Sequence, residues 1–260
     1  MAASRPFTDG WATTALAALL YPVGPAAIVL MPMIVGGLID GYGYSEQQAG
    51  NIAALEGLGL VASSALAAGW IRRVSWVRAL WLAAGAYAAI NLASGQVTAY
   101  APLLALRFAA GFAGGNLFAV AVAALGDGRE PDRAFGVAQA VQGVLMLGAF
   151  AAAPALLAAA GPPALYGLLA GFAVLAAAVA LRFPDRGRHA AVVAGDGPAP
   201  HRGLIALGLV ASVVFFVNVF GFWAFVERIG QAGGVAPATI GIALGASQVV
   251  AIGGALAAAA

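Results

Sequence analysis

Residues 98–126 read TAYAPLLALRFAAGFAGGNLFAVAVAALG, and this stretch decides the fold class. It contains a single charged side chain, Arg107, and it exceeds the roughly 20 apolar residues that a helix needs to cross a bilayer. Seven other stretches are similarly apolar. We therefore predict eight spanning helices, near residues 13–39, 47–70, 76–95, 98–126, 134–159, 163–182, 203–228 and 237–260. The first and fourth are long enough to tilt or to extend into the interface.

The composition of the whole chain agrees with a lipid environment. Of its 260 residues, 63% are hydrophobic and only 8% are charged, against roughly 25% charged in a typical soluble domain. The predicted fold class is all-α, a polytopic transmembrane helical bundle. The chain lacks cysteine, which excludes disulfides and thiolate chemistry. Its arginines sit at loop ends instead of gathering on one face, so we expect no nucleic-acid partner.

The arginines also predict the orientation, because cytoplasmic loops carry the excess of basic residues. Every second connection between the predicted helices contains arginines, and the other connections contain no basic residue. The segments predicted to be cytoplasmic contain Arg5, Arg72, Arg73, Arg78, Arg129, Arg133, Arg182, Arg186, Arg188 and Arg202. This alternation predicts a cytoplasmic N-terminus. The organisation that follows is a six-helix bundle over 1–182, a cytoplasmic linker over 183–202 and two helices of a second bundle over 203–260.

Several motifs resemble those of the major facilitator superfamily of transporters. The connection after the second helix is basic, as in that superfamily, and its motif residues are Gly69, Arg72, Arg73 and Arg78. The fourth helix carries Arg107-x-x-x-Gly111, which is similar to the superfamily's motif in that helix. A polar linker after six helices, followed by a restart, fits its parallel repeats.

The resemblance implies a secondary transporter and twelve helices in the whole protein. The chain departs from the family pattern at Arg73, where an acidic residue is usual, and at Ala110, where a glutamine is usual. Transport direction and drug specificity are therefore not inferred. Because eight spans are predicted, we expect the chain to be a fragment whose remaining partners are the C-terminal helices of the second bundle.

Two ionisable residues inside predicted spans are the leading candidates for function, because a buried charge is expensive in a membrane. Glu56 and Arg107 each lie about nine residues from the outer end of their helix, which is roughly 14 Å deep. We expect them to face each other or a shared polar cavity. In the functional interpretation Glu56 exchanges a proton while Arg107 favours its charged form or holds an anionic substrate group. The alternative is a structural ion pair that locks the bundle.

Further residues are candidates for lining a substrate cavity. Prolines break membrane helices, and broken helices often line transporter cavities, which singles out the first helix. The residues predicted to line a cavity are Tyr21, Pro25, Gln139, Gln142 and Asn218. For the last three, interhelical hydrogen bonding is the competing explanation. Glu227 and Arg228, near a helix end, are expected to form a solvated surface pair.

The sequence predicts a carrier of a small solute that works by alternating access, with protons as a candidate second substrate. The expected location is a bacterial inner membrane. No phosphate-binding loop, nucleophile–base pair or metal-ligand cluster is found, so we expect no enzyme activity, cofactor or metal, and we expect His189 and His201 to be solvated. The alternatives are a non-transporting receptor or assembly subunit on the same scaffold and, less in keeping with the residues, a membrane-embedded enzyme.

Overall fold

The computed structural model describes residues 7–8, 10–187 and 202–258, and these residues form helices and connections without a strand. The predicted linker over 183–202 falls mostly outside the described residues, as do His189 and His201. The helices are α1 (Trp11–Leu20), α2 (Ala26–Val29), α3 (Met31–Tyr42), α4 (Glu46–Trp70), α5 (Trp76–Ser94), α6 (Tyr100–Gly126), α7 (Pro131–Ala160), α8 (Pro162–Ala180), α9 (Arg202–Ala232) and α10 (Pro237–Ala258). This confirms the all-helical part of the prediction.

Five of these helices, α4, α6, α7, α8 and α10, are long and apolar enough to cross a membrane by length and composition. Several apolar helices of this kind in one chain are typical of a multi-pass membrane protein, because a bilayer requires each backbone group to be satisfied within its own helix. The predicted boundaries agree with the helices to within a few residues. The largest difference is at α9, which continues to Ala232 instead of ending near residue 228. The count of eight spans stays a prediction.

The first predicted span is divided into three helices. α1 ends at Leu20, the turn over 21–25 is not helical, and Leu30 alone separates α2 from α3. Pro22 and Pro25 explain the first break, because a proline lacks the amide hydrogen that a helix interior requires and its ring clashes with the preceding turn. Pro32 lies in the first turn of α3, where proline is tolerated, and its missing amide hydrogen accounts for the second break, at Leu30.

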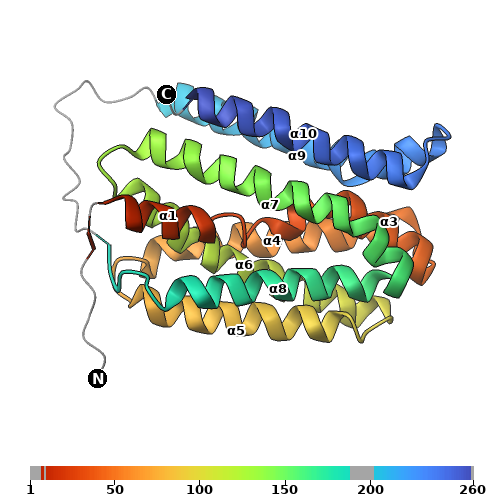
Figure 1. Cartoon of the computed structure of the whole chain (residues 1–260), viewed down its shortest axis with the longest axis horizontal. Helices are drawn as coiled ribbons and strands as arrows, with labels where there is room; N and C mark the ends of the chain where they lie inside the picture. Colours follow the sequence, from red (N-terminus) through yellow and green to blue (C-terminus); the bar gives the residue numbers. More distant parts are fainter. Residues whose placement is uncertain (1–6, 9, 188–201, 259–260) are drawn as a thin grey trace.

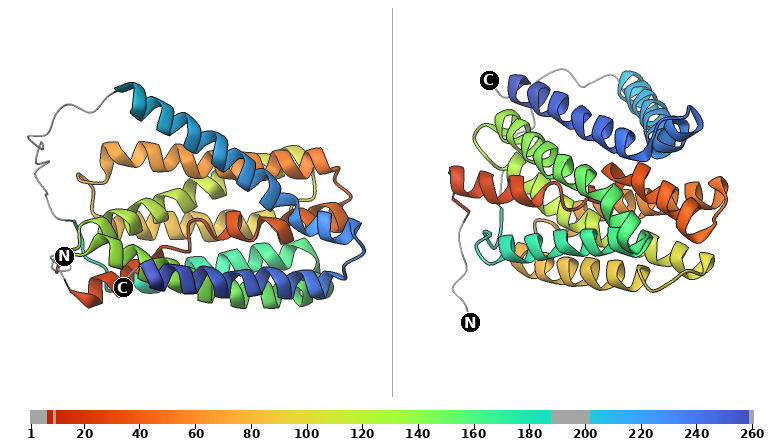
Figure 2. Two further views of the ribbon diagram at one scale, coloured as in Figure 1. Left: turned by 90° about the horizontal axis from the view of Figure 1, so that it is seen from above. Right: turned by 45° about the vertical axis from the view of Figure 1, so that its right-hand side comes forward.

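The helices run roughly along the long axis of the molecule (Figure 1). α5 and α8 lie along one edge, and α9 and α10 lie along the opposite edge. α10 runs beside α7, whereas α9 crosses α3 obliquely (Figure 2). The last two helices therefore pack on one side of the bundle made by the first eight.

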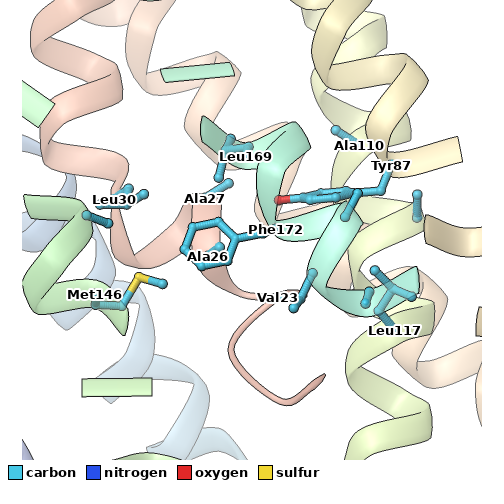
Figure 3. Close-up of a cluster of buried hydrophobic side chains, with 14 of the residues drawn as sticks. Val23, Ala26, Ala27, Leu30, Tyr87, Ala110, Leu117, Met146, Leu169 and Phe172 are labelled. Carbon is cyan, nitrogen blue, oxygen red and sulfur yellow. The ribbon is translucent and has the colours of Figure 1, made fainter. Parts of the chain in front are cut away.

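The broken segment between α1 and α3 lies at the centre of the hydrophobic core. Val23 of the turn and Ala26, Ala27 and Leu30 are all at most 2% exposed. Figure 3 shows them surrounded by side chains of the other core helices, namely Tyr87, Ala110, Leu117, Met146, Leu169 and Phe172. The division of the first span thus lets a short, small-residue segment fill the middle of the bundle.

α4 and α6 make the closest helix contact that positions the candidate site. A Cβ added at Gly111 would overlap the backbone carbonyl of Glu56, and a Cβ at Gly59 would overlap the backbone carbonyl of Phe108. Small residues allow two membrane helices to approach until their backbones touch. Gly111 and Gly59 therefore allow α4 and α6 to pack backbone against backbone at the level of Glu56.

Candidate functional site

The candidate site is built on the interior of α4 and α6, where the glycine contact brings the two backbones together. Glu56 and Arg107 project from these helices toward each other, and Arg107 Nη1 lies 3.2 Å from Glu56 Oε1. Their side chains are 1% and 0% exposed. The structure therefore pairs the two residues that depth alone had placed at the same level, and it buries both completely.

α5 supplies the other polar partners of Arg107. Both Nη1 and Nη2 donate to Asn91 Oδ1 at 3.1 Å, and Nη2 also donates to Ser94 Oγ at 2.7 Å. Asn91 Nδ2 in turn donates to the Tyr87 carbonyl, and Ser94 Oγ donates to the Ile90 carbonyl. Asn91 and Ser94 are three residues apart, so they share one face of α5. Sequence reasoning missed both, although their spacing inside a span was a usable signal.

α8 closes the site with an aromatic ring. The Arg107 guanidinium carbon lies 4.5 Å from the centre of the Tyr166 ring, a cation–π contact. The hydroxyl groups of Tyr166 and Tyr87 are both buried, and that of Tyr166 has no hydrogen-bond partner among the described residues. Two more hydrogen-bonding groups thus accompany the ion pair in the interior of the bundle, and neither was singled out from the sequence.

The ion pair itself is incompletely satisfied. Glu56 Oε2 and Arg107 Nε are buried without a hydrogen-bond partner among the described residues. A buried polar atom in that state is costly, and burial of the carboxylate favours its neutral form while Arg107 favours its charged form. The arrangement can hold a proton on Oε2 or release it, provided that a path to the site opens.

The other predicted cavity residues lie elsewhere. The ring of Tyr21 packs on Phe118, with centroids 5.0 Å apart, and Pro25 precedes α2. In α7 and α9 the predicted residues have different surroundings: Gln139 and Asn218 are exposed, whereas Gln142 is half-buried and its Oε1 has no partner among the described residues. None of them hydrogen-bonds to the Glu56–Arg107 pair, so the structure does not gather the predicted set into one site.

The basic connection between α4 and α5 is tied to neighbouring helix ends. Arg72 binds Asp127 with two hydrogen bonds, of 2.5 and 2.7 Å, which raise the pKa of the Arg72 guanidinium. Gly69, Arg73 and Arg78 are exposed. Asp127 at the end of α6 is another residue that the sequence analysis did not single out. Its opposite charge on the same predicted side was the available signal.

The same connection also reaches the segment after α8. The Trp76 amide donates to the Asp185 carbonyl at 2.7 Å, and Ser75 Oγ hydrogen-bonds to the Asp185 carboxylate. Trp76 is completely buried and its ring packs on Phe183. These contacts fasten the ends of α4, α5, α6 and α8 together at one end of the bundle.

The expectation of a solvated Glu227–Arg228 pair was wrong. Glu227 is only 5% exposed, because α9 continues to Ala232 and crosses α3 at this level. Arg228 pairs with Asp40 of α3 at 2.7 Å instead of with its neighbour in the chain. The prediction assumed that Glu227, near a helix end, would contact water. The packing of α9 against α3, which is distant in the sequence, buries it instead.

Comparison with known proteins adds no family assignment. No protein-family model matches the chain, and no curated protein matches it. Among the described residues, no group of three or more histidine, aspartate or glutamate side chains is placed to hold a metal ion. The functional argument therefore rests on the residues and their geometry.

Proposed function

We propose that the chain belongs to a secondary transporter that moves a small solute across a membrane by alternating access, with Glu56 as the group that exchanges protons. The observation that carries the proposal is the fully buried ion pair between Glu56 and Arg107, whose carboxylate keeps one oxygen unpartnered among the described residues. Ionisable side chains inside membrane helices are rare, and they commonly mark ion or proton pathways.

The roles of the residues follow from the contacts. Arg107 is held by Asn91, Ser94 and the Tyr166 ring, so its position is fixed from α5 and α8. Among the described residues, Glu56 has only Arg107 as a side-chain partner, so a change in its protonation state acts directly on this one contact. Protonation would release the Glu56–Arg107 contact between α4 and α6. A change of that kind couples a proton to helix packing.

The arrangement of α9 and α10 suits the same proposal. They pack on one side of the first bundle, against α3 and α7, where a second bundle would meet it (Figure 2). In transporters made of two repeats the substrate site lies between the halves, and rocking of one half against the other alternates access. We extend the proposal to a major-facilitator-like protein with eight spans in this chain, a cytoplasmic N-terminus and a bacterial inner-membrane location.

A non-transporting scaffold is the second candidate, and one observation favours it. Arg107 donates to Glu56, Asn91 and Ser94 at once, which is what a structural lock between α4, α5 and α6 would require. The pair also lies inside the first bundle instead of at the contacts with α9 and α10. A receptor or assembly subunit would keep these contacts permanently closed, whereas a carrier must break them during its cycle.

The absence of cysteine from the sequence permits a test that needs no known substrate. Single cysteines at Tyr21 and Gln142, introduced into the complete reading frame after replacement of any cysteine outside these 260 residues, are exposed to a membrane-impermeant maleimide from either side of oriented vesicles. Alternating access predicts labelling from both sides at one or both positions. Leu82→Cys, at a residue 76% exposed on α5, is the lipid-facing control and stays unlabelled. Labelling from one side only, under every condition, would favour the scaffold.

The role of Glu56 is tested in the same single-cysteine proteins. If Glu56 exchanges protons, the ratio of labelling from the two sides depends on pH, and Glu56→Gln removes that dependence while labelling continues. Where a transported solute is found, its uptake or efflux should lose its pH dependence in the same variant. Flux by Glu56→Gln that keeps its full pH dependence would remove this residue from the coupling role.

A further inference from the structure

The end of the molecule where α9 crosses α3 contains a second buried carboxylate, which the proposed transport mechanism does not use. Glu227 lies one turn before the end of α9, opposite Gly36 of α3. A Cβ added at Gly36 would overlap the Glu227 carboxylate, so the glycine supplies the space that the carboxylate occupies. The carboxylate is therefore packed against the backbone of α3 and is not a solvated surface group.

A short chain of hydrogen bonds fixes this carboxylate. Gln231, one turn further along α9, donates from Nε2 to Glu227 Oε1. Arg228 Nη1 donates to Gln231 Oε1 at 3.0 Å and to Asp40 Oδ1 at 2.7 Å. The nearby guanidinium is thus engaged by Gln231 and Asp40. Glu227 Oε2 has no hydrogen-bond partner among the described residues.

Glu227 helps to line a cavity of about 270 Å³. Glu227, Gln231 and Asp40 supply its polar lining, and the apolar lining comes from Met33, Leu157 and prolines of neighbouring helices. The two carboxylates and the one guanidinium of this cluster leave one formal negative charge. The volume of the cavity is slightly smaller than that of common ligand pockets, which suits a ligand smaller than a typical drug.

We propose that this cavity is a binding site for a small organic cation, specifically a primary ammonium group that donates to the Glu227 carboxylate while its apolar part lies on Met33 and Leu157. Charge and hydrogen bonding both favour such a ligand, since a carboxylate oxygen accepts strongly from an ammonium group. The apolar walls disfavour a metal ion, because calcium takes six to eight oxygen ligands and magnesium six. The proposal does not depend on transport, because it concerns binding alone.

The test uses isobutylammonium as the probe, with isobutanol as its neutral analogue, and the chain reconstituted in lipid nanodiscs. Saturation-transfer NMR measures binding of each compound. Glu227→Gln removes the negative charge with little change of shape and is expected to weaken isobutylammonium binding by about 10- to 100-fold. Gly36→Ala keeps the charge but displaces the carboxylate and should weaken binding similarly. Gly85→Ala, where an added Cβ meets nothing within 4 Å, is the matched control and should bind normally.

The outcomes separate the proposal from its competitors. Saturable binding of isobutylammonium that is lost in Glu227→Gln and Gly36→Ala, with circular dichroism and elution unchanged, supports the site. Equal binding of isobutanol would mean an apolar cavity only and would overturn the proposal. So would complete displacement of the probe by sodium or magnesium, which would assign the carboxylate to a metal ion. Binding that persists in Glu227→Gln, or no saturable binding to the unaltered chain, also overturns it.

Discussion

Two buried glutamates occupy contrasting surroundings in this molecule. Glu56 meets Arg107 directly, at 3.2 Å, inside the first bundle. Glu227 meets Gln231 instead, while Arg228, the nearby guanidinium, pairs with Asp40. Both glutamates keep one carboxylate oxygen without a partner among the described residues. The carboxylate of Glu56 has a counterion but is enclosed by protein. The carboxylate of Glu227 has no direct counterion in the described part of the chain but lines a cavity. In this molecule the better-compensated charge is therefore the one that is less open to a ligand.

The physical consequence lies in what each site can tolerate. The charges of Glu56 and Arg107 are buried together, and removing either leaves the other charge without its counterion in a low-dielectric interior. Around Glu227 the salt bridge is partly solvated, since Asp40 is 56% exposed and Arg228 is 24% exposed at their side chains. We therefore expect the first site to be stability-critical and the second to be open to ligand exchange.

The largest expected effect is that of Arg107→Met. Loss of the guanidinium leaves Glu56 buried without its counterion and removes the donors to Asn91 and Ser94, so the free energy of unfolding should fall by about 3–5 kcal/mol. Unfolding in mixed micelles, followed by circular dichroism, measures this change. The double variant Glu56→Gln with Arg107→Met should recover part of the loss, because no uncompensated carboxylate remains. A loss no greater than that of Arg228→Met would break the contrast between the two sites.

The next effect concerns the glycine contacts that support each glutamate. Gly111→Ala sets a Cβ against the backbone of Glu56, which cannot move without shifting α4, so we expect a loss of about 1–3 kcal/mol in unfolding free energy. Gly36→Ala sets a Cβ against the side chain of Glu227, which can rotate, and it should cost less. The same unfolding assay compares them, with Gly85→Ala as the control in open space. Equal losses in the two glycine variants would show that both glutamates are held equally rigidly.

Much of the fold was predictable because membrane helices must satisfy their own backbone groups, so long apolar runs translate directly into helices. α4 illustrates this: the predicted stretch over 47–70 became Glu46–Trp70, and Ser45 with Gln48 forms a capping box that fixes its start. The division of the first span was only partly predictable. Its prolines indicated a break, but the placement of α2 in the centre of the core depends on contacts with several distant helices.

The candidate site was predictable to a lesser extent. Counting residues from the same side placed Glu56 and Arg107 at one depth, and the contact of α4 with α6 brings them within reach of each other. Asn91 and Tyr166 could not be assigned in this way, because rotation of α5 and α8 about their axes is set by tertiary packing. Glu227 was misinterpreted for the same reason, since only the crossing of α3 and α9 buries it.

The smallest effect on stability is expected for Arg228→Gln. This variant also gives the most direct test of how the Glu227 site differs from the Glu56 site. The ion pair of Arg228 with Asp40 is partly exposed, so its loss should lower the free energy of unfolding by less than about 1 kcal/mol. The same change removes the positive charge beside the cavity, leaving two carboxylates without a guanidinium, and binding of isobutylammonium should tighten by roughly two- to fivefold. Titration in nanodiscs, alongside the unfolding assay, measures both quantities. Weaker binding would mean that Arg228 holds Gln231 and Glu227 in place for the ligand, and that positioning matters more than charge at this end of the molecule.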